Sequence, residues 1–135
     1  MTYDEFIELQ KQQPEARPRR NEEHRLQVSC VTWFRMIYPE HAGLLYAVPN
    51  GGRRDAVTGR HLKAEGVLAG VSDLNLDLPN RYYHGMRIEM KIRTGRQQQS
   101  QRRYQQDVER AGYKYAICRS LDAFMEVVKE YMKGR

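Results

Sequence analysis

The sequence has few of the residues that mark a secreted, membrane or zinc-binding protein. Only two cysteines, Cys30 and Cys118, occur in 135 residues, and their apolar neighbours favour small buried thiols in a reducing compartment over a disulfide. The four histidines have no spacing typical of a zinc site. No apolar run approaches a membrane span, and the start MTYDEFIELQ lacks the features of a signal peptide. We therefore expect a cytoplasmic protein without a membrane partner.

Acidic residues are also fewer than basic ones. Asp and Glu number 17 against 23 Lys and Arg, which gives a formal charge of +6 and a pI of about 9.5. This balance favours an anionic partner, and nucleic acid is the first candidate because phosphate contacts dominate its affinity. Each basic cluster alone is an ordinary solvated surface, but their repetition in or near expected loops favours nucleic-acid binding. The clusters are Arg17, Arg19 and Arg20; Arg53, Arg54, Arg60 and Lys63; Arg93 and Arg96; Arg102 and Arg103.

The chain length fits one α/β domain that contains a small mixed sheet flanked by helices. Residues 1–20, which contain two prolines, are expected to form an N-terminal arm, and residues 21–135 the domain. Strand 87–92, helix 98–111 and strand 114–118 predict a crossover between parallel strands. The other expected elements are a helix from Asn21, as its cap, to Tyr38; strands over 44–48 and 74–78; and helices over 60–65 and after Ser120.

Two alternating runs lie within GVSDLNLDLPNRYYHGMRIEMKIR, residues 70–93. At a strand's period of two, Asp73 lies opposite the leucines of the first run, and Glu89 and Lys91 share one face of the second. If these three side chains meet, the two carboxylates repel each other unless a hard cation such as Mg²⁺ or Mn²⁺ lies between them. Metal, carboxylates and lysine together suit phosphodiester hydrolysis. An exposed sheet face with incidental charges is the more common origin of such a pattern.

A further carboxylate lies on the apolar stripe of the first long helix. Glu23 projects near the centre of this stripe, where an unpaired charge is costly. A metal ion, a lysine or a hydrogen bond at the helix start would each satisfy it. The stripe consists of Leu26, Cys30, Trp33, Phe34 and Ile37.

Several segments together resemble the VRR-NUC domain, a branch of the PD-(D/E)xK nucleases. They occur in the family's order and spacing, and the likeness runs from about residue 21 to 132. The segments are EEHRLQVSCVTWFRMIYPE, VPNGGRR, LKAEGVLAGVSDLNL, HGMRIEMKIRTGR and SQRRYQQDVERAGYKYAIC.

The resemblance implies roles for the residues of the alternating runs. Asp73 and Glu89 would bind the metal together with the backbone carbonyl of Met90, and Lys91 would be the lysine of the Glu-x-Lys motif. Glu23 matches the acidic residue on the family's helix, and would bind the metal directly or through water.

Other matching positions would support the site. Gln101 matches a catalytic glutamine on the helix after the Glu-x-Lys strand, and Tyr104 follows it. The chain departs from the family at Ser72, where proline is usual; proline sets the backbone there but binds no metal. We expect DNA contacts from Asn50, Arg53, Arg54, Arg93 and Arg96.

The resemblance also implies an activity: Mg²⁺- or Mn²⁺-dependent hydrolysis of DNA, leaving 5′-phosphate and 3′-hydroxyl ends. Small stand-alone members, from bacteria and phages, resemble structure-selective junction nucleases, so a homodimer acting on branched DNA such as a four-way (Holliday) junction is expected. The competing interpretations are a non-catalytic nucleic-acid-binding module with this fold, or a nuclease that acts on linear DNA or on RNA.

Overall fold

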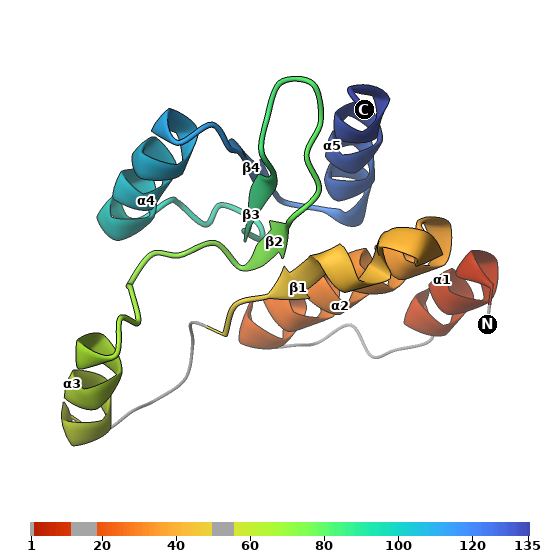
Figure 1. Cartoon of the computed structure of the whole chain (residues 1–135). Helices are drawn as coiled ribbons and strands as arrows, with labels where there is room; N and C mark the ends of the chain where they lie inside the picture. The colour runs from red at the N-terminus through yellow and green to blue at the C-terminus, as the bar shows by residue number, and fades with distance from the viewer. Residues whose placement is uncertain (1, 12–18, 50–55) are drawn as a thin grey trace.

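The computed structural model describes residues 2–11, 19–49 and 56–135, and has the mixed α/β architecture expected from the sequence (Figure 1). Among these residues, no helix is both long enough and apolar enough to cross a membrane. The elements in chain order are α1 (Tyr3–Lys11), α2 (Arg19–Ile37), the 3₁₀ helix η1 (Pro39–Leu44), β1 (Leu45–Ala47), α3 (Ala56–Ala64), β2 (Leu74–Leu76), β3 (Met86–Met90), α4 (Gln99–Arg110), β4 (Lys114–Cys118) and α5 (Leu121–Lys133).

The four strands form one mixed sheet in the order β1-β2-β3-β4. The pairs β1–β2 and β2–β3 are antiparallel, whereas β3 and β4 are parallel and joined by α4. The expected crossover is therefore confirmed. In this sheet Leu74 pairs with Ile88, and Glu89 pairs with Ile117 of the parallel neighbour.

The two faces of the sheet have different coverings. One face packs against α2 and α5 in a core of fully or nearly fully buried side chains. On the opposite face, α4 lies over β4 and the end of β3: the Tyr104 ring lies 6.4 Å from that of Tyr115, and Gln101 Nε2 donates to Glu89 Oε1. The Glu89 side chain of β3 therefore lies between the sheet and α4. The largest fully buried side chains are those of Trp33, Phe34, Leu45, Leu74, Leu76, Met86, Ile88, Phe124 and Val128.

Helix α2 differs from the expectation at both ends. It begins at Arg19, so Asn21 lies inside the helix and the expected cap at this residue is wrong. Ile37 is 46% exposed, although the apolar stripe predicts that it is buried. It is the last residue of the helix, and the next residue, Tyr38, packs against the core instead, with its ring 5.2 Å from that of Phe34.

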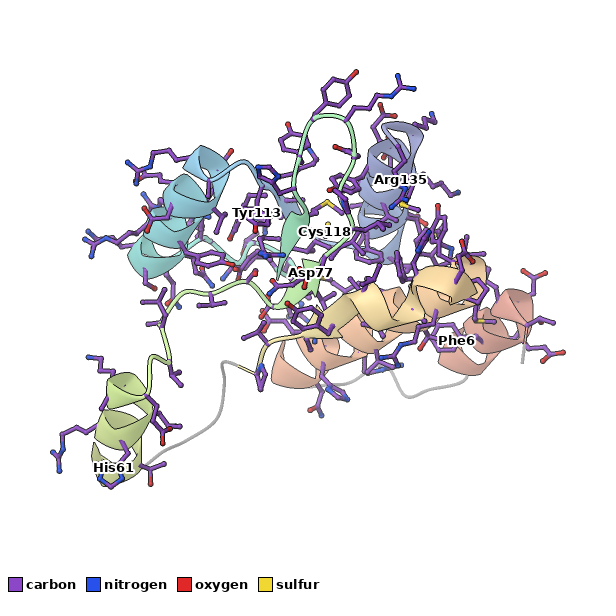
Figure 2. The ribbon with its side chains drawn as sticks, viewed as in Figure 1. Phe6, His61, Asp77, Tyr113, Cys118 and Arg135 are labelled. Carbon is purple, nitrogen blue, oxygen red and sulfur yellow. The ribbon has the colours of Figure 1, made fainter. Side chains whose placement is uncertain are left out.

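The segment before α2 also packs on the domain. Phe6 of α1 is buried (Figure 2), and the Tyr3 hydroxyl donates to Met125 Sδ of α5 at 3.2 Å. The arm boundary at residue 20 remains a prediction. Helix α3, by contrast, stands away from the sheet (Figure 1), with His61 on its outer part (Figure 2).

The other expected elements occur within a few residues of their predicted limits. The strand expected over 44–48 covers Leu45–Ala47, and the helix expected over 60–65 extends over Ala56–Ala64. The last helix begins as expected at Ser120, whose hydroxyl accepts from Ala123 N at 3.0 Å. The end of α4 is followed by Gly112 at a φ of +96°, a conformation that favours glycine.

Candidate active site

Asp73 and Glu89 approach each other at the junction of β2 and β3. The antiparallel register pairs Leu74 with Ile88, and extended by one step it sets Asp73 opposite Glu89, on the same side of the sheet. The Asp73 backbone N–H donates to Ile88 O at 3.0 Å, and Asp73 Oδ2 accepts from Met90 N at 2.7 Å. The two carboxyl groups, one just before β2 and one in β3, therefore belong to one small cluster.

Polar side chains from three elements hold Glu89, which is only 2% exposed. Gln101 Nε2 of α4 donates to Glu89 Oε1 at 2.6 Å, and the Tyr115 hydroxyl of β4 donates to Oε2 at 3.1 Å. Lys91, two residues along the chain, places Nζ 3.8 Å from Oε1. Each carboxylate oxygen thus has a hydrogen-bond donor, which fixes the plane of the group.

Burial makes the ionised form of both acids costly. Burial is the main cause that raises the pKa of Glu89 to about 7, and the charge of Asp73 adds to it, against the opposing effects of Lys91 and of the Tyr115 hydrogen bond. Burial also raises the pKa of Asp73, although the Met90 N–H and Lys91 lower it. The pKa of Tyr115 is raised by burial and by Glu89, so its hydroxyl stays protonated and remains a donor.

Gln101 is itself held in one orientation by the start of α4. It occupies the third position of the helix, where Gln101 Oε1 accepts from the Gln98 backbone N–H at 2.7 Å. The amide oxygen is thus committed to the helix cap, which turns the amide NH₂ toward Glu89. The cap of α4 and the carboxylate of β3 are linked through this one side chain.

Gly70 brings the chain before Asp73 against the same helix start. Its φ is +85°, and a Cβ placed on it would lie 2.5 Å from the backbone C and O atoms of Ser100. Only glycine fits this combination of backbone conformation and close approach. The loop that contains Asp73 and the helix that contains Gln101 are therefore in direct backbone contact.

Ser72 shows what replaces the usual proline of the family motif. Its side chain is fully buried, and its hydroxyl donates to Asn75 Oδ1 at 2.6 Å. Ser72 Oγ also lies 3.2 Å from the Tyr104 hydroxyl of α4. The serine thus connects the strand of Asp73 to the helix of Gln101 by hydrogen bonds, where a proline would fix only its own backbone.

Glu23 lies half-buried in the first turns of α2. Within the described ranges, no group of three or more His, Cys, Asp or Glu side chains is arranged so that it could hold a metal ion. The structure therefore gathers Asp73 and Glu89 but does not add Glu23 to them. Its role as a metal ligand stays a prediction.

The residues expected to contact DNA are placed differently from one another. Arg93 is exposed at a φ of 48° and pairs with Glu22 of α2, and Arg96 is exposed nearby. Asn50, Arg53 and Arg54 lie outside the described residues.

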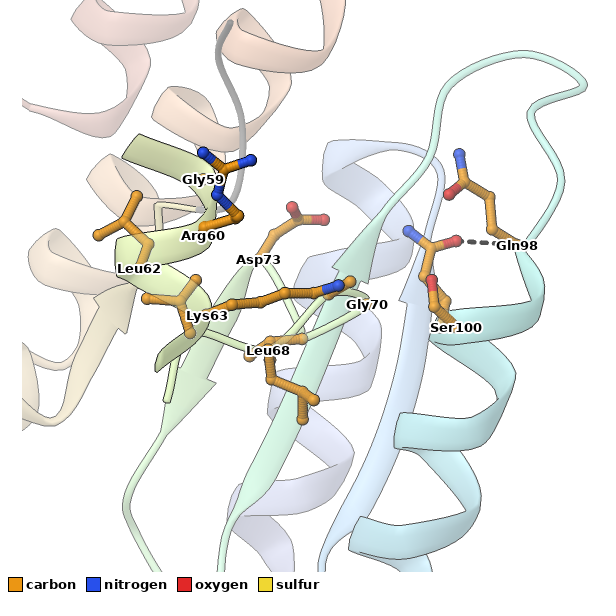
Figure 3. A pocket seen from close by; sticks show the side chains of 13 residues that line it. Gly59, Arg60, Leu62, Lys63, Leu68, Gly70, Asp73, Gln98 and Ser100 are labelled. Atoms are coloured by element: carbon orange, nitrogen blue, oxygen red, sulfur yellow. Dashed lines mark hydrogen bonds between the residues drawn. The ribbon is translucent and has the colours of Figure 1, made fainter. Parts of the chain in front are cut away.

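A cleft opens next to Asp73, between α3 and the start of α4. Its volume is about 570 Å³, and Arg60 and Lys63 of α3 lie on one side of it, with Gln98 and Ser100 on the other (Figure 3). The two basic residues belong to a cluster noticed in the sequence, but nothing there placed them beside the carboxylates. The volume of the cleft lies within the range of about 300–1,000 Å³ that is usual for ligand-binding pockets.

Sequence reasoning missed Tyr115 and Gln97. Gln97 Nε2 donates to Gln105 Oε1 at 2.7 Å and lies 3.4 Å from the Tyr115 hydroxyl, so it supports the donor that holds Glu89. The alternation along β4 predicts from the sequence on which side of the strand Tyr115 lies. Its proximity to Glu89 depends on the parallel register with β3, which local patterns do not specify.

The donor set fits a hard divalent cation. Two neighbouring carboxylates, one buried and one half-buried, gain from a cation placed between them, and oxygen donors are those that Mg²⁺ and Mn²⁺ prefer. Asp73, Glu89 and the Met90 carbonyl are the groups that would hold it. Lys91, 9% exposed and beside Glu89, could add positive charge for a phosphoryl oxygen.

Comparisons with known proteins agree with this geometry. Residues 10–122 match the VRR-NUC domain family. A solved structure described as a VRR_NUC domain protein is similar in fold, with a TM-score of 0.73 and 22% identity over 83% of this chain and 88% of that one. No curated protein matches the sequence. Because the family match covers most of the chain, the protein belongs to the VRR-NUC family and carries a nuclease-type domain of the PD-(D/E)xK superfamily.

Proposed function

We propose that the protein is a divalent-metal-dependent DNA endonuclease whose catalytic centre consists of Asp73, Glu89 and Lys91. The observation that carries this proposal is the meeting of the buried Glu89 carboxyl group with the half-buried carboxyl group of Asp73, with Lys91 Nζ 3.8 Å from Glu89 Oε1. A bound Mg²⁺ or Mn²⁺ supplies the charge that polarises the scissile phosphate and acidifies water.

The protein's own residues then have distinct tasks. Asp73 and Glu89 bind the cation, together with the Met90 carbonyl, and Glu23 contributes directly or through water. Lys91 holds a phosphoryl oxygen and orients the attacking water. Gln101 keeps the Glu89 carboxylate in the orientation that its helix cap dictates.

The cleft beside Asp73 accommodates the substrate in this proposal. Arg60 and Lys63 line its α3 side and face a DNA phosphate next to the scissile one. Arg93 and Arg96 contact the strand on the other side of the centre. Phosphate contacts of this kind make affinity fall with salt, so raising the ionic strength should weaken binding before it alters the fold.

Substitution of Lys91 tests the catalytic assignment. We expect Lys91→Ala to slow DNA cleavage in Mg²⁺ by at least about a hundredfold. The negative charge on the phosphoryl oxygens of the transition state would no longer be stabilised by the lysine. Lys129→Ala, at an exposed position of α5, is the matched control and should cleave like wild type. If Lys91→Ala cleaves as fast as the control, the centre lies elsewhere. If even wild type cleaves neither DNA nor RNA in Mg²⁺ or Mn²⁺, a binding module with this fold is the better interpretation.

We further propose that the enzyme selects branched DNA and acts as a homodimer, because two sites related by a dyad match the symmetry of a four-way junction. Cleavage rates on a four-way junction, a flap and a linear duplex in Mg²⁺ test the selectivity, and equal rates on all three contradict it. Sedimentation equilibrium of the protein alone and with junction DNA tests the dimer. A monomer in both conditions contradicts it.

A further inference from the structure

The tip of the connection between β2 and β3 presents an aromatic ring to solvent. Tyr82 is 74% exposed, the largest exposed fraction among the large hydrophobic residues of the described chain. Its neighbour Tyr83 behaves differently, because its ring stacks on Tyr131 of α5 with a centroid distance of 6.3 Å. Packing within the domain therefore explains Tyr83 but gives no reason for an aromatic residue at position 82.

The backbone that carries Tyr82 is held firmly. Asn80 Oδ1 accepts from the backbone N–H groups of Tyr82 and Tyr83, at 2.9 and 2.8 Å. Asn80 Nδ2 donates to Tyr131 O at 3.1 Å, and Arg81 N donates to Gly134 O at 2.7 Å. The tip is thus tied to the end of α5, beside the C-terminus (Figure 1). A ring on such a support loses little backbone freedom when it binds a partner.

Basic residues outnumber acidic ones beside the ring. A hollow of about 280 Å³ adjoins it, and three basic residues but one acidic residue line this hollow. Lys114 Nζ lies 5.6 Å from the centroid of the Tyr83 ring. Lys133 pairs with Glu130 at 3.6 Å, but both side chains are about three-quarters exposed, so the pair is weak and its lysine can contact another anion. The third basic residue is Arg81.

An exposed aromatic ring among cations suits one class of ligand, an unpaired nucleic-acid strand. Each base has a flat face that stacks on tyrosine, and its phosphates find the basic side chains. In a duplex the bases are stacked on one another and only the phosphates are accessible. A duplex would therefore contact the basic side chains but not the Tyr82 ring.

We propose that Arg81, Tyr82, Lys114 and Lys133 form a second DNA-binding site, the hairpin-tip site, which binds an unpaired strand with one base stacked on Tyr82. The inference rests on the proposed function in taking DNA as the partner, and it adds which part of the DNA is bound. Even fully extended, at about 3.3 Å per residue, the chain from Tyr82 to Glu89 spans at most about 25 Å. A strand that leaves the cut site can therefore reach the tip within several nucleotides.

Binding to a fluorescent oligothymidylate, measured by anisotropy in EDTA with the full chain, tests the site without cleavage. We expect Tyr82→Ala to weaken binding about tenfold and Tyr82→Phe, which keeps the stacking face, to change it less than about twofold. Lys133→Ala should weaken binding, whereas Lys129→Ala, one turn earlier on α5 and outside the hollow, should not. Ultraviolet crosslinking of an iodouracil-substituted strand should label Tyr82.

Three results would overturn the hairpin-tip site. The first is that Tyr82→Ala binds the oligonucleotide like wild type; the second is that binding of a blunt duplex falls by the same factor. The third is that wild type sediments as a dimer and Tyr82→Ala as a monomer, because the ring would then belong to an interface between two copies. Absence of any cleavage by wild type, with the Tyr82→Ala binding defect intact, would contradict the proposed nuclease and leave this site standing.

Discussion

Replacing Glu89 with glutamine should stabilise the metal-free protein, because the native carboxyl is held where its charge is costly. The side chain is 3% exposed, and its pKa is raised from 4.5 to about 7. At about pH 8, where the group is ionised, this costs the folded state about 3 kcal/mol relative to the unfolded chain. Glutamine keeps the shape without the charge. Since Lys91 loses a partner, we expect the free energy of unfolding to rise by about 2 to 3 kcal/mol.

The gain should depend on pH in one direction. Between pH 4.5 and about 7 the folded protein retains the Glu89 proton that the unfolded chain releases, so the stability of the wild type falls as the pH rises through this window. At about pH 5 the folded wild type is protonated at Glu89, and the difference between the two proteins should shrink to below about 1 kcal/mol.

Urea unfolding in EDTA at about pH 5 and pH 8, followed by the fluorescence of Trp33, measures both differences. Glu126→Gln, at an exposed position of α5, is the matched control and should change little at either pH. Added Mg²⁺ should then stabilise wild type and not Glu89→Gln, because only wild type keeps both carboxylates. A variant less stable than wild type at the higher pH, or a gain that is equal at both, would refute this reasoning.

Two further predictions concern the supports of the site. Tyr115→Phe removes the donor to Glu89 Oε2 and should weaken Mg²⁺ or Mn²⁺ binding about tenfold by titration calorimetry; an unchanged affinity would mean that the hydroxyl does not position the carboxylate. Gly70→Ala would press a Cβ to within 2.5 Å of the Ser100 backbone at a φ of +85°, and should lower the free energy of unfolding by about 2 kcal/mol or more, with loss of cleavage. Gly43→Ala, with open space around the added Cβ, is the control for urea unfolding, and equal effects of the two substitutions would contradict the argument.

The parts of the fold that depend on local pattern could be predicted from the sequence. The alternation around Glu89 gives its strand and the side on which its carboxyl lies, and the Ser120 hydroxyl marks the start of the last helix. The meeting of Asp73 with Glu89 follows from the same alternation once the two strands are taken as neighbours. Strand period and helix caps involve residues close in sequence, so their signals survive without knowledge of the tertiary structure.

The parts of the fold that depend on which elements become neighbours could not be predicted from the sequence. Tyr115 reaches Glu89 only because β4 pairs in parallel with β3 at one particular register. Arg93 pairs with Glu22, 71 residues earlier, through the packing of α2 near the end of the Glu-x-Lys strand. Ile37 continued the apolar period of its helix but lies at the helix end, where the turn that follows brings Tyr38 to the core in its place.

The parallel pairing of β3 with β4 makes the order of synthesis matter. Glu89 is made before the strand that carries Tyr115, and before the helix whose Gln101 completes its support. A nascent chain that ends before residue 114 has both carboxyl-bearing strands but lacks the neighbour that buries and orients one of them. In the proposed enzyme, competence to cut DNA therefore requires synthesis to continue past residue 118, because only then can the strand that carries Tyr115 pair with β3.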